Sequence, residues 1–158
     1  MATWAEFEAA APELAALGPK PPPGVSFPIA FLATVRADGA PRVHPFCPIF
    51  AGGRVFAAIP PSSPKGNDLR RDGRYVMHAL PGPRDDEFSV RGRAREIDDD
   101  ESRSLVQKAV DATGVGGMMK SVRAHALFEL DIDRVDVAWW ENVGQADTYV
   151  VRRRWPIA

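Results

Sequence analysis

Residues 60–69, PPSSPKGNDL, form the segment with the densest group of side chains that could do chemistry. Two hydroxyls, Ser62 and Ser63, precede Lys65 at the start of a predicted short helix that follows a predicted strand. The amides and the dipole at a helix start attract anions such as phosphate, and a charge-assisted bond from a lysine contributes ~1.5–3 kcal/mol. The pattern indicates a phosphate site. An ordinary N-cap by Ser63, with Lys65 in solvent, is the commoner explanation of such a pattern.

Residues 42–45, RVHP, are a second candidate on a neighbouring predicted strand. Alternation along a strand puts Arg42 and His44 on one face. A guanidinium matches the geometry of a phosphate, and a proline leaves nearby backbone groups available to a planar ring. A surface arginine and a packing histidine remain the alternative. The strand neighbours the one that leads into residues 60–69, so both segments could converge on one ligand.

The elements that must position these residues are mostly strands. Strands over residues 29–36, 42–50 and 54–59, with an Asp-Gly turn over 37–39, predict a three-stranded antiparallel meander. Pro45 and Pro48 predict that the second strand is interrupted, bulged or at an edge. Further strands are expected over residues 74–80, 87–97, 125–132 and 148–155, and residues 135–140 either continue the third of these or pair with it. Alternation in the second of these puts Phe88, Val90, Gly92 and Ala94 on one face and the serine and arginines between them on the other.

About three short helices surround these strands. The first spans residues 3–17, starts with a capping box of Thr3 and Glu6, and is followed by a proline-rich connector that ends at residue 28. The others span residues 65–72 and a segment capped by Asp98 that runs to residue 112. Strands that come in runs, rather than alternating with helices, argue against a Rossmann sheet. They favour a mainly β fold, a small antiparallel barrel with peripheral helices.

Composition excludes several other classes of protein. The length of 158 residues predicts one domain, and a net charge of −1 gives no reason to expect nucleic acid or a membrane surface. No apolar run approaches 18 residues, and the acidic N-terminus does not resemble a secretory signal, so we expect a cytoplasmic protein. The single cysteine, Cys47, excludes an internal disulfide, and we expect it to be buried rather than catalytic. The three histidines show no metal-ligand spacing, so no metal site is expected.

Three motifs occur in order along the chain: ATVRADGAPRVHP at residues 33–45, KGNDLRRDGR at 65–74 and FSVRGRA at 88–94. Together they resemble the pyridoxamine 5′-phosphate oxidase-like, FMN-binding split-barrel family of the flavin/deazaflavin oxidoreductase superfamily. The resemblance covers residues 29–97 well and the remainder only in general layout. It implies an antiparallel split β-barrel in which residues 1–158 form one FMN-binding domain, with residues 1–28 as N-terminal helix and connector.

The resemblance also implies a homodimer with two flavin sites at the subunit interface. The phosphate would be held by Arg42, Lys65, Ser62 and Ser63, and the backbone of Val43, His44 and Pro45 would run along the isoalloxazine ring. Ile59 and Asn67 belong to the same implied cofactor-binding set, and Trp140 or Trp139 of the partner would close the site. Hydride or electrons would pass between FMN and an unidentified small substrate, with NAD(P)H as a candidate donor. The cofactor would carry the chemistry, and no catalytic side chain is identified.

The chain departs from the true oxidases after its tryptophan pair. Those enzymes carry an R-[aliphatic]-H-[acidic]-R segment that grips the substrate, whereas residues 141–145 here are ENVGQ. The resemblance therefore does not extend to vitamin B6 oxidation. An F420-dependent reductase of the same superfamily is an alternative, since the acidic tail of F420 would suit the arginines of residues 91–95 or 152–154. A non-catalytic flavin-binding or stress-related module, or a barrel that has lost its cofactor, is another.

Overall fold

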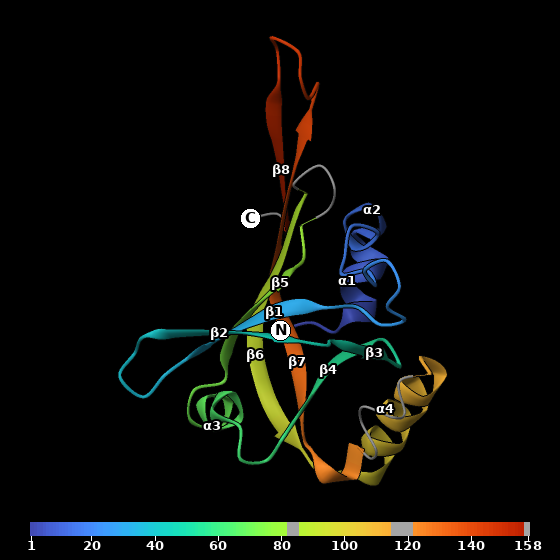
Figure 1. The fold of residues 1–158 in the computed structure, drawn as a ribbon, viewed down its shortest axis with the longest axis vertical. Coiled ribbons are helices and arrows are strands. Elements are labelled where there is room, and N and C mark those ends of the chain that lie inside the picture. The colour runs from blue at the N-terminus through green and yellow to red at the C-terminus, as the bar shows by residue number, and fades with distance from the viewer. Residues whose placement is uncertain (82–85, 115–121, 157–158) are drawn as a thin grey trace.

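The computed structural model describes residues 1–81, 86–114 and 122–156, in which eight antiparallel strands form one sheet with helices around it (Figure 1). The order of paired strands is β2-β1-β5-β6-β7-β4-β3, and β8 pairs with β7. The strands are β1 (Ala30–Val35), β2 (Pro41–Phe46), β3 (Ile49–Ala51), β4 (Arg54–Ile59), β5 (Arg74–Ala79), β6 (Glu87–Ile97), β7 (Ala126–Glu141) and β8 (Tyr149–Trp155). The sheet curls without closing, which confirms the predicted split barrel with peripheral helices.

The barrel splits at residues 47–48, between β2 and β3. The expected interruption of the second strand at its prolines is confirmed, and both antiparallel pairs of the predicted meander form, but the interruption divides the middle strand, so the three strands are not a continuous meander. β2 pairs with β1, whereas β3 pairs with β4. The two halves of the predicted second strand therefore lie at opposite ends of the order of paired strands. Pro48 has no amide to donate to a ladder, and the chain therefore changes partners there.

The long strands β6 and β7 form the spine of the barrel. The predicted inward face of β6 is confirmed, with Phe88, Val90 and Ala94 buried and the arginines between them exposed. A β-bulge follows Arg91, where a Cβ on Gly92 would lie 1.8 Å from the carbonyl oxygen of Asp131. Because backbone approaches this closely, only glycine fits there.

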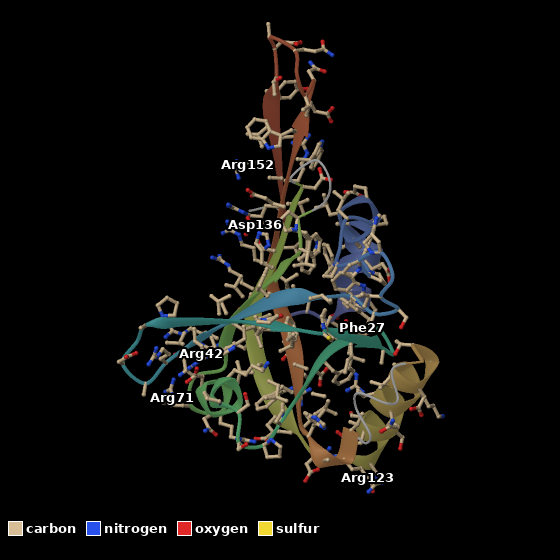
Figure 2. All side chains as sticks on the ribbon, in the orientation of Figure 1. Phe27, Arg42, Arg71, Arg123, Asp136 and Arg152 are labelled. Carbon is tan, nitrogen blue, oxygen red and sulfur yellow. The ribbon has the colours of Figure 1, made fainter. Side chains whose placement is uncertain are left out.

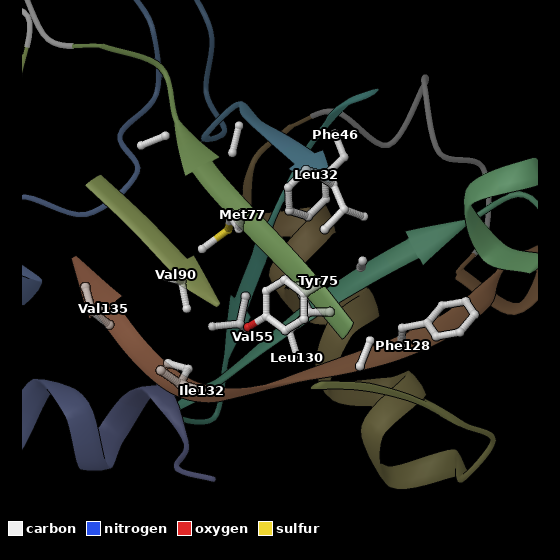
Figure 3. Packing of buried hydrophobic residues seen from close by; sticks show 14 of the residues in the cluster. Leu32, Phe46, Val55, Tyr75, Met77, Val90, Phe128, Leu130, Ile132 and Val135 are labelled. Atoms are coloured by element: carbon white, nitrogen blue, oxygen red, sulfur yellow. The ribbon is translucent and has the colours of Figure 1, made fainter. Parts of the chain in front are cut away.

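Buried side chains from both walls of the barrel fill its interior, as Figure 3 shows for Leu32, Tyr75, Met77, Val90 and Leu130. A second cluster lies under α4 (Asp100–Ala112), where Val106 and Val110 pack with β3, β4 and β7 residues. The core is therefore divided into a barrel interior and a smaller unit that joins α4 to the sheet.

The helices are α1 (Trp4–Ala10), α2 (Pro12–Ala15), α3 (Pro64–Arg71) and α4, with a 3-10 turn η1 (Val122–Ala124). The capping box of Thr3 and Glu6 is confirmed, but the single helix over residues 3–17 is wrong. Ala11 leaves the helical conformation and Pro12 starts a new helix, because proline has no amide to continue the first one. In the described part of the chain, no helix combines the length and apolar character needed to span a membrane.

The predicted cap of α4 is also wrong by one residue. Asp99 accepts a hydrogen bond from the Ser102 amide at 2.7 Å, whereas Asp98 pairs with Arg103 Nε at 2.8 Å. Asp99 has the extended conformation that an N-cap needs, and Asp98 lies one position too early to reach the orphan amides.

Candidate functional site

A buried carboxylate joins the two segments that the sequence nominated. Asp68 of α3 accepts hydrogen bonds from Arg42 Nε of β2 at 2.7 Å and from Thr34 Oγ1 of β1 at 3.0 Å. Arg71 adds contacts at 3.4 Å, and both arginines lie beside α3 in Figure 2. Burial raises the pKa of Asp68, but the hydrogen bonds from Arg42, Thr34 and Arg71 outweigh it and hold that pKa below its usual value.

The network fixes where α3 starts relative to β2. Arg42 is therefore engaged by Asp68, and its side chain holds the barrel wall to α3. Sequence reasoning missed Asp68 as a site residue. The available signal was weak: an aspartate three positions after Lys65 on the same predicted helix. Its hydrogen-bond partners, Thr34 and Arg42, lie on strands that are distant in the sequence.

Lys65 stands at the first turn of α3 and is half-buried. Desolvation by burial lowers the pKa of its ammonium group, and the nearby Cys47 has a smaller opposing effect. Within residues 1–81, 86–114 and 122–156, no carboxylate forms an ion pair with it. A cation is thus partly removed from water without a counter-charge, which is a cost that an anionic ligand would offset.

Cys47 lies in the break between β2 and β3, and the expectation that it is buried is wrong, because the residue is exposed. Packing around the sulfur still raises the pKa of its thiol, against a smaller lowering effect of Lys65. The neutral thiol therefore dominates, which agrees with the expectation that it is not an activated nucleophile.

The two serines precede α3. Ser63 occupies the N-cap position, but its side chain makes no capping hydrogen bond, so a Ser63 side-chain cap does not explain this residue. Its carbonyl instead accepts from the amides of Gly66 and Asn67, at 3.0 and 3.2 Å. Ser62 is exposed in the turn closed by the Ser63 amide and the Pro60 carbonyl at 2.9 Å. Both hydroxyls are consequently left beside Lys65 without a capping role.

Two other predicted cofactor residues have contacts within the fold. Ile59 is 1% exposed, and its side chain packs in the barrel core. Any contact of Ile59 with a ligand would therefore involve its backbone. Asn67 Oδ1 accepts from Arg70 Nη1 at 3.1 Å, and Arg70 is held by two hydrogen bonds to Glu96.

The remaining residues of RVHP divide between the two faces of β2. Arg42 and His44 are half-buried on the face shared with the buried Phe46, which confirms that the two point the same way. Val43 and Pro45 point outward and are exposed. They belong to an outer apolar patch that we define by residues Phe31, Ala33, Val43, Pro45 and Val76, which the strand register brings side by side.

The two tryptophans differ in their surroundings. Trp139 is partly buried against the core, donates to Glu141 Oε1 at 2.8 Å and lies under the guanidinium of Arg153. Trp140 is 39% exposed, on the hairpin of β7 and β8 that projects beyond the rest of the molecule in Figure 1. The register places Trp140 on the same sheet face as the outer apolar patch. Of the pair, Trp140 is the one available to a second molecule.

Of the six arginines proposed for an acidic tail, Arg95, Arg152 and Arg154 form ion pairs with carboxylates of the described residues. Arg154 and Arg134 both bind Asp136 at 2.8 Å, and Arg152 lies 3.7 Å from Glu87. Arg95 binds the buried Glu129 at 2.6 Å. Arg152 lies far from Arg42 in Figure 2, so the arginines of residues 152–154 are not an extension of the α3 site within one chain.

The structure also contains an apolar cavity of about 270 Å³, which the sequence did not reveal. It is formed by the connector, the β2–β3 break, α4 and His125, and is lined by Phe27, Pro28, Cys47, Pro48, Ile49, Phe50, Ala109, Val110, Thr113 and His125. Cys47 is common to the cavity and to the surroundings of Lys65. Its walls come from four separate segments, so local sequence patterns carry no signal for it.

The fold resembles solved structures at low sequence identity, and no curated protein sequence matches the chain. A heme binding protein from Mycobacterium smegmatis superposes with a TM-score of 0.61 at 18% identity, over 81% of this chain and 53% of that protein, so the chain spans about half its length. A NimC/NimA family protein from Clostridium acetobutylicum gives 0.60 at 16% identity, over 94% of this chain and 95% of that one. The heme storage protein from Vibrio cholerae gives 0.56 at 14% identity, over 66% and 81%.

The sequence itself matches one family. The profile of the pyridoxamine 5′-phosphate oxidase family matches residues 25–141, which include all of the barrel except β8. The match contains the three motifs, the split at residues 47–48 and the start of α3. The chain belongs to the pyridoxamine 5′-phosphate oxidase family.

Proposed function

We propose that this protein binds FMN at the start of α3 and acts as an oxidoreductase on a small substrate other than pyridoxamine phosphate. The observation that carries the proposal is the half-buried Lys65, which has no carboxylate partner among the described residues and follows two serines whose hydroxyls do not cap the helix. This donor set fits a phosphate group, with one cation, two hydroxyls and a helix start. The family match supports the proposal that this phosphate belongs to a flavin cofactor.

The residues of this chain would bind and orient the cofactor. Lys65, Ser62 and Ser63 would hold its phosphate, and Arg42, positioned by Asp68, would add positive charge. The exposed edge at Val43 and Pro45 would lie along the ring system. When bound, FMN supplies hydride or electron transfer, so no acid or base from the chain is required.

The proposed site is completed by a second copy of the chain. Apolar side chains of the outer apolar patch, with Val43 59% and Phe31 39% exposed, are unusual for a monomer when they adjoin. Trp140 lies on the same sheet face at the projecting hairpin, where a second copy could receive it. Both features support a homodimer with flavin sites at the interface.

Replacement of Val76 by lysine tests the dimer. Val76 lies in the outer apolar patch but outside the proposed flavin contacts, so Val76→Lys should weaken self-association about tenfold or more by burying an ammonium group. Sedimentation equilibrium measures the effect. The matched control is Leu17→Lys, which changes an exposed leucine outside the patch and should not change association. Equal effects of both variants, or a native protein that is monomeric at all concentrations, would refute the dimer.

The visible absorption spectrum of the purified protein, followed by titration with FMN, tests the cofactor. A two-band flavin spectrum, or tight binding of added FMN, is the expected result. An intense haem band would instead identify haem as the ligand, as in the names of the heme binding and heme storage proteins that share this fold. Binding of F420 without FMN binding would favour the deazaflavin reductase, and binding of FMN without turnover over a broad acceptor panel would favour the non-catalytic module.

A further inference from the structure

The apolar cavity beside Cys47 is built from parts that the fold holds in place. Ser26 Oγ donates to the carbonyl of Thr113, which ties the connector to the end of α4. Thr113 Oγ1 donates to the Val110 carbonyl at 2.6 Å, and this hydrogen bond fixes the orientation of the Thr113 side chain. Phe27 and Pro28 therefore face Ala109 and Val110 across a space of about 270 Å³. Such a space is at the small end of ligand pockets, which hold ~300–1,000 Å³.

The chemistry of the lining selects against charge. No arginine, lysine, aspartate or glutamate of the described residues lines the cavity. Cys47, Thr113 and His125 supply its polar side chains, and burial of a phosphate among the others would leave that charge unpaired. Two cations act on lining residues from outside the cavity: Lys65 on the Cys47 thiol, and Arg103, whose Nη1 donates to the His125 carbonyl at 3.1 Å. The cavity therefore fits a neutral ring, with one end toward Cys47.

We propose that this cavity holds the substrate's body, and that the substrate is an uncharged aromatic molecule of one or two rings. The assignment of the occupant as a substrate rests on the proposed flavin function, since Cys47 in the cavity wall and Lys65 of the α3 site influence each other's pKa. Binding of such a ring to the cavity does not require the cofactor.

Protection of Cys47 from alkylation tests the proposal on the native protein without cofactor. The chain has a single cysteine, and it lines the cavity, so iodoacetamide reports on that wall alone. At tenfold over its dissociation constant, 2-naphthol should slow the alkylation about tenfold, because only the free protein reacts. 2-Naphthyl phosphate, the same ring system with a charge, should protect at least about tenfold less well. Equal protection by both compounds, or none by 2-naphthol at millimolar concentration, would overturn the proposal.

A filled cavity provides the second measurement. Ala109→Phe places a ring in the cavity from α4, whereas the control Ala112→Phe places the same ring on the exposed side near the helix end. The first should weaken 2-naphthol binding about tenfold or more, and the second should not change it. Unchanged binding to a folded Ala109→Phe protein would place the probe elsewhere and refute the cavity. If that variant does not fold, the comparison of the two naphthyl probes on the native chain decides.

A separate titration with FMN distinguishes this result from the proposed function. If 2-naphthol binds the cavity and FMN does not bind, the ring site stands and the flavin assignment fails. If FMN binds and neither naphthyl compound protects Cys47, the flavin assignment stands and the cavity proposal fails.

Discussion

Lys65→Ala should weaken FMN binding by ~1.5–3 kcal/mol, or roughly 10- to 150-fold, and leave riboflavin binding nearly unchanged. The reason is that the lysine would contact the phosphate, which riboflavin lacks. Lys65 is half-buried and has no carboxylate partner in the described residues, so its removal takes away the charge that offsets the ligand's phosphate. Fluorescence titration with both flavins measures the two affinities.

The control for this variant is Lys108→Ala, which removes an exposed lysine of α4 and should change neither affinity. The cofactor-free Lys65→Ala protein should be at least as stable to heat as the native chain, because a partly desolvated cation has been removed. Equal losses for FMN and riboflavin would mean that Lys65 does not contact the phosphate. A loss confined to the melting temperature would give it a role in folding alone.

Local pattern was sufficient to predict the strands and their inward faces. The alternation of Phe88, Val90 and Ala94 predicted β6 with its observed bounds, and residues 54–59 predicted β4. Glycine turns and prolines located the ends of these strands. Such signals are local, since they arise from side chains two positions apart or from backbone restrictions at one residue.

Strand pairing required information that the local pattern lacks. Pro48 predicted a break in the strand. It did not predict that β2 and β3, on either side of the break, would lie at opposite ends of the order of paired strands. That choice depends on β7, which pairs with β4 and lies more than sixty residues later in the chain. The same limit applies to the helix ends, since Asp99 rather than the predicted Asp98 caps α4 and the first helix ends at Ala11, before Pro12.

The candidate site shows the same division. Sequence patterns predicted that the segments of Lys65 and Arg42 converge because their strands are neighbours, but β2 and β4 lie apart in the sheet, and the Arg42–Asp68 hydrogen bond joins β2 to α3 instead. They did not reveal that Arg42 is held by Asp68, since a side-chain partner 26 residues away leaves no periodic trace. The apolar cavity also escaped detection, because each of its four segments contributes only one to four ordinary side chains.

Asp68→Asn should lower the free energy of unfolding by about 2–3 kcal/mol. Loss of one partner of a buried ion pair typically costs about 3–5 kcal/mol, and partial exposure of both arginines reduces that cost. The Asp68 side chain is 5% exposed, against 24% for Arg42 and 41% for Arg71. Asparagine keeps the shape and removes the charge, so packing is not disturbed. Urea unfolding followed by circular dichroism measures the difference.

The control is Asp98→Asn, which removes an Arg–Asp pair of similar length whose carboxylate is 86% exposed. Such surface pairs contribute about 0–1 kcal/mol, so the two variants separate burial from ion pairing as the source of stability.

The pH dependence of stability tests the role of the Asp68 charge independently. Because the fold lowers the pKa of Asp68, its stabilisation is complete above the unfolded value of about 3.9 and is lost as pH falls through the lower, folded value. The stability difference between native protein and Asp68→Asn should therefore be constant near neutrality and shrink below pH ~4. A difference that stays constant into that acid range would mean that the charge of Asp68 is not what holds α3 to β1 and β2.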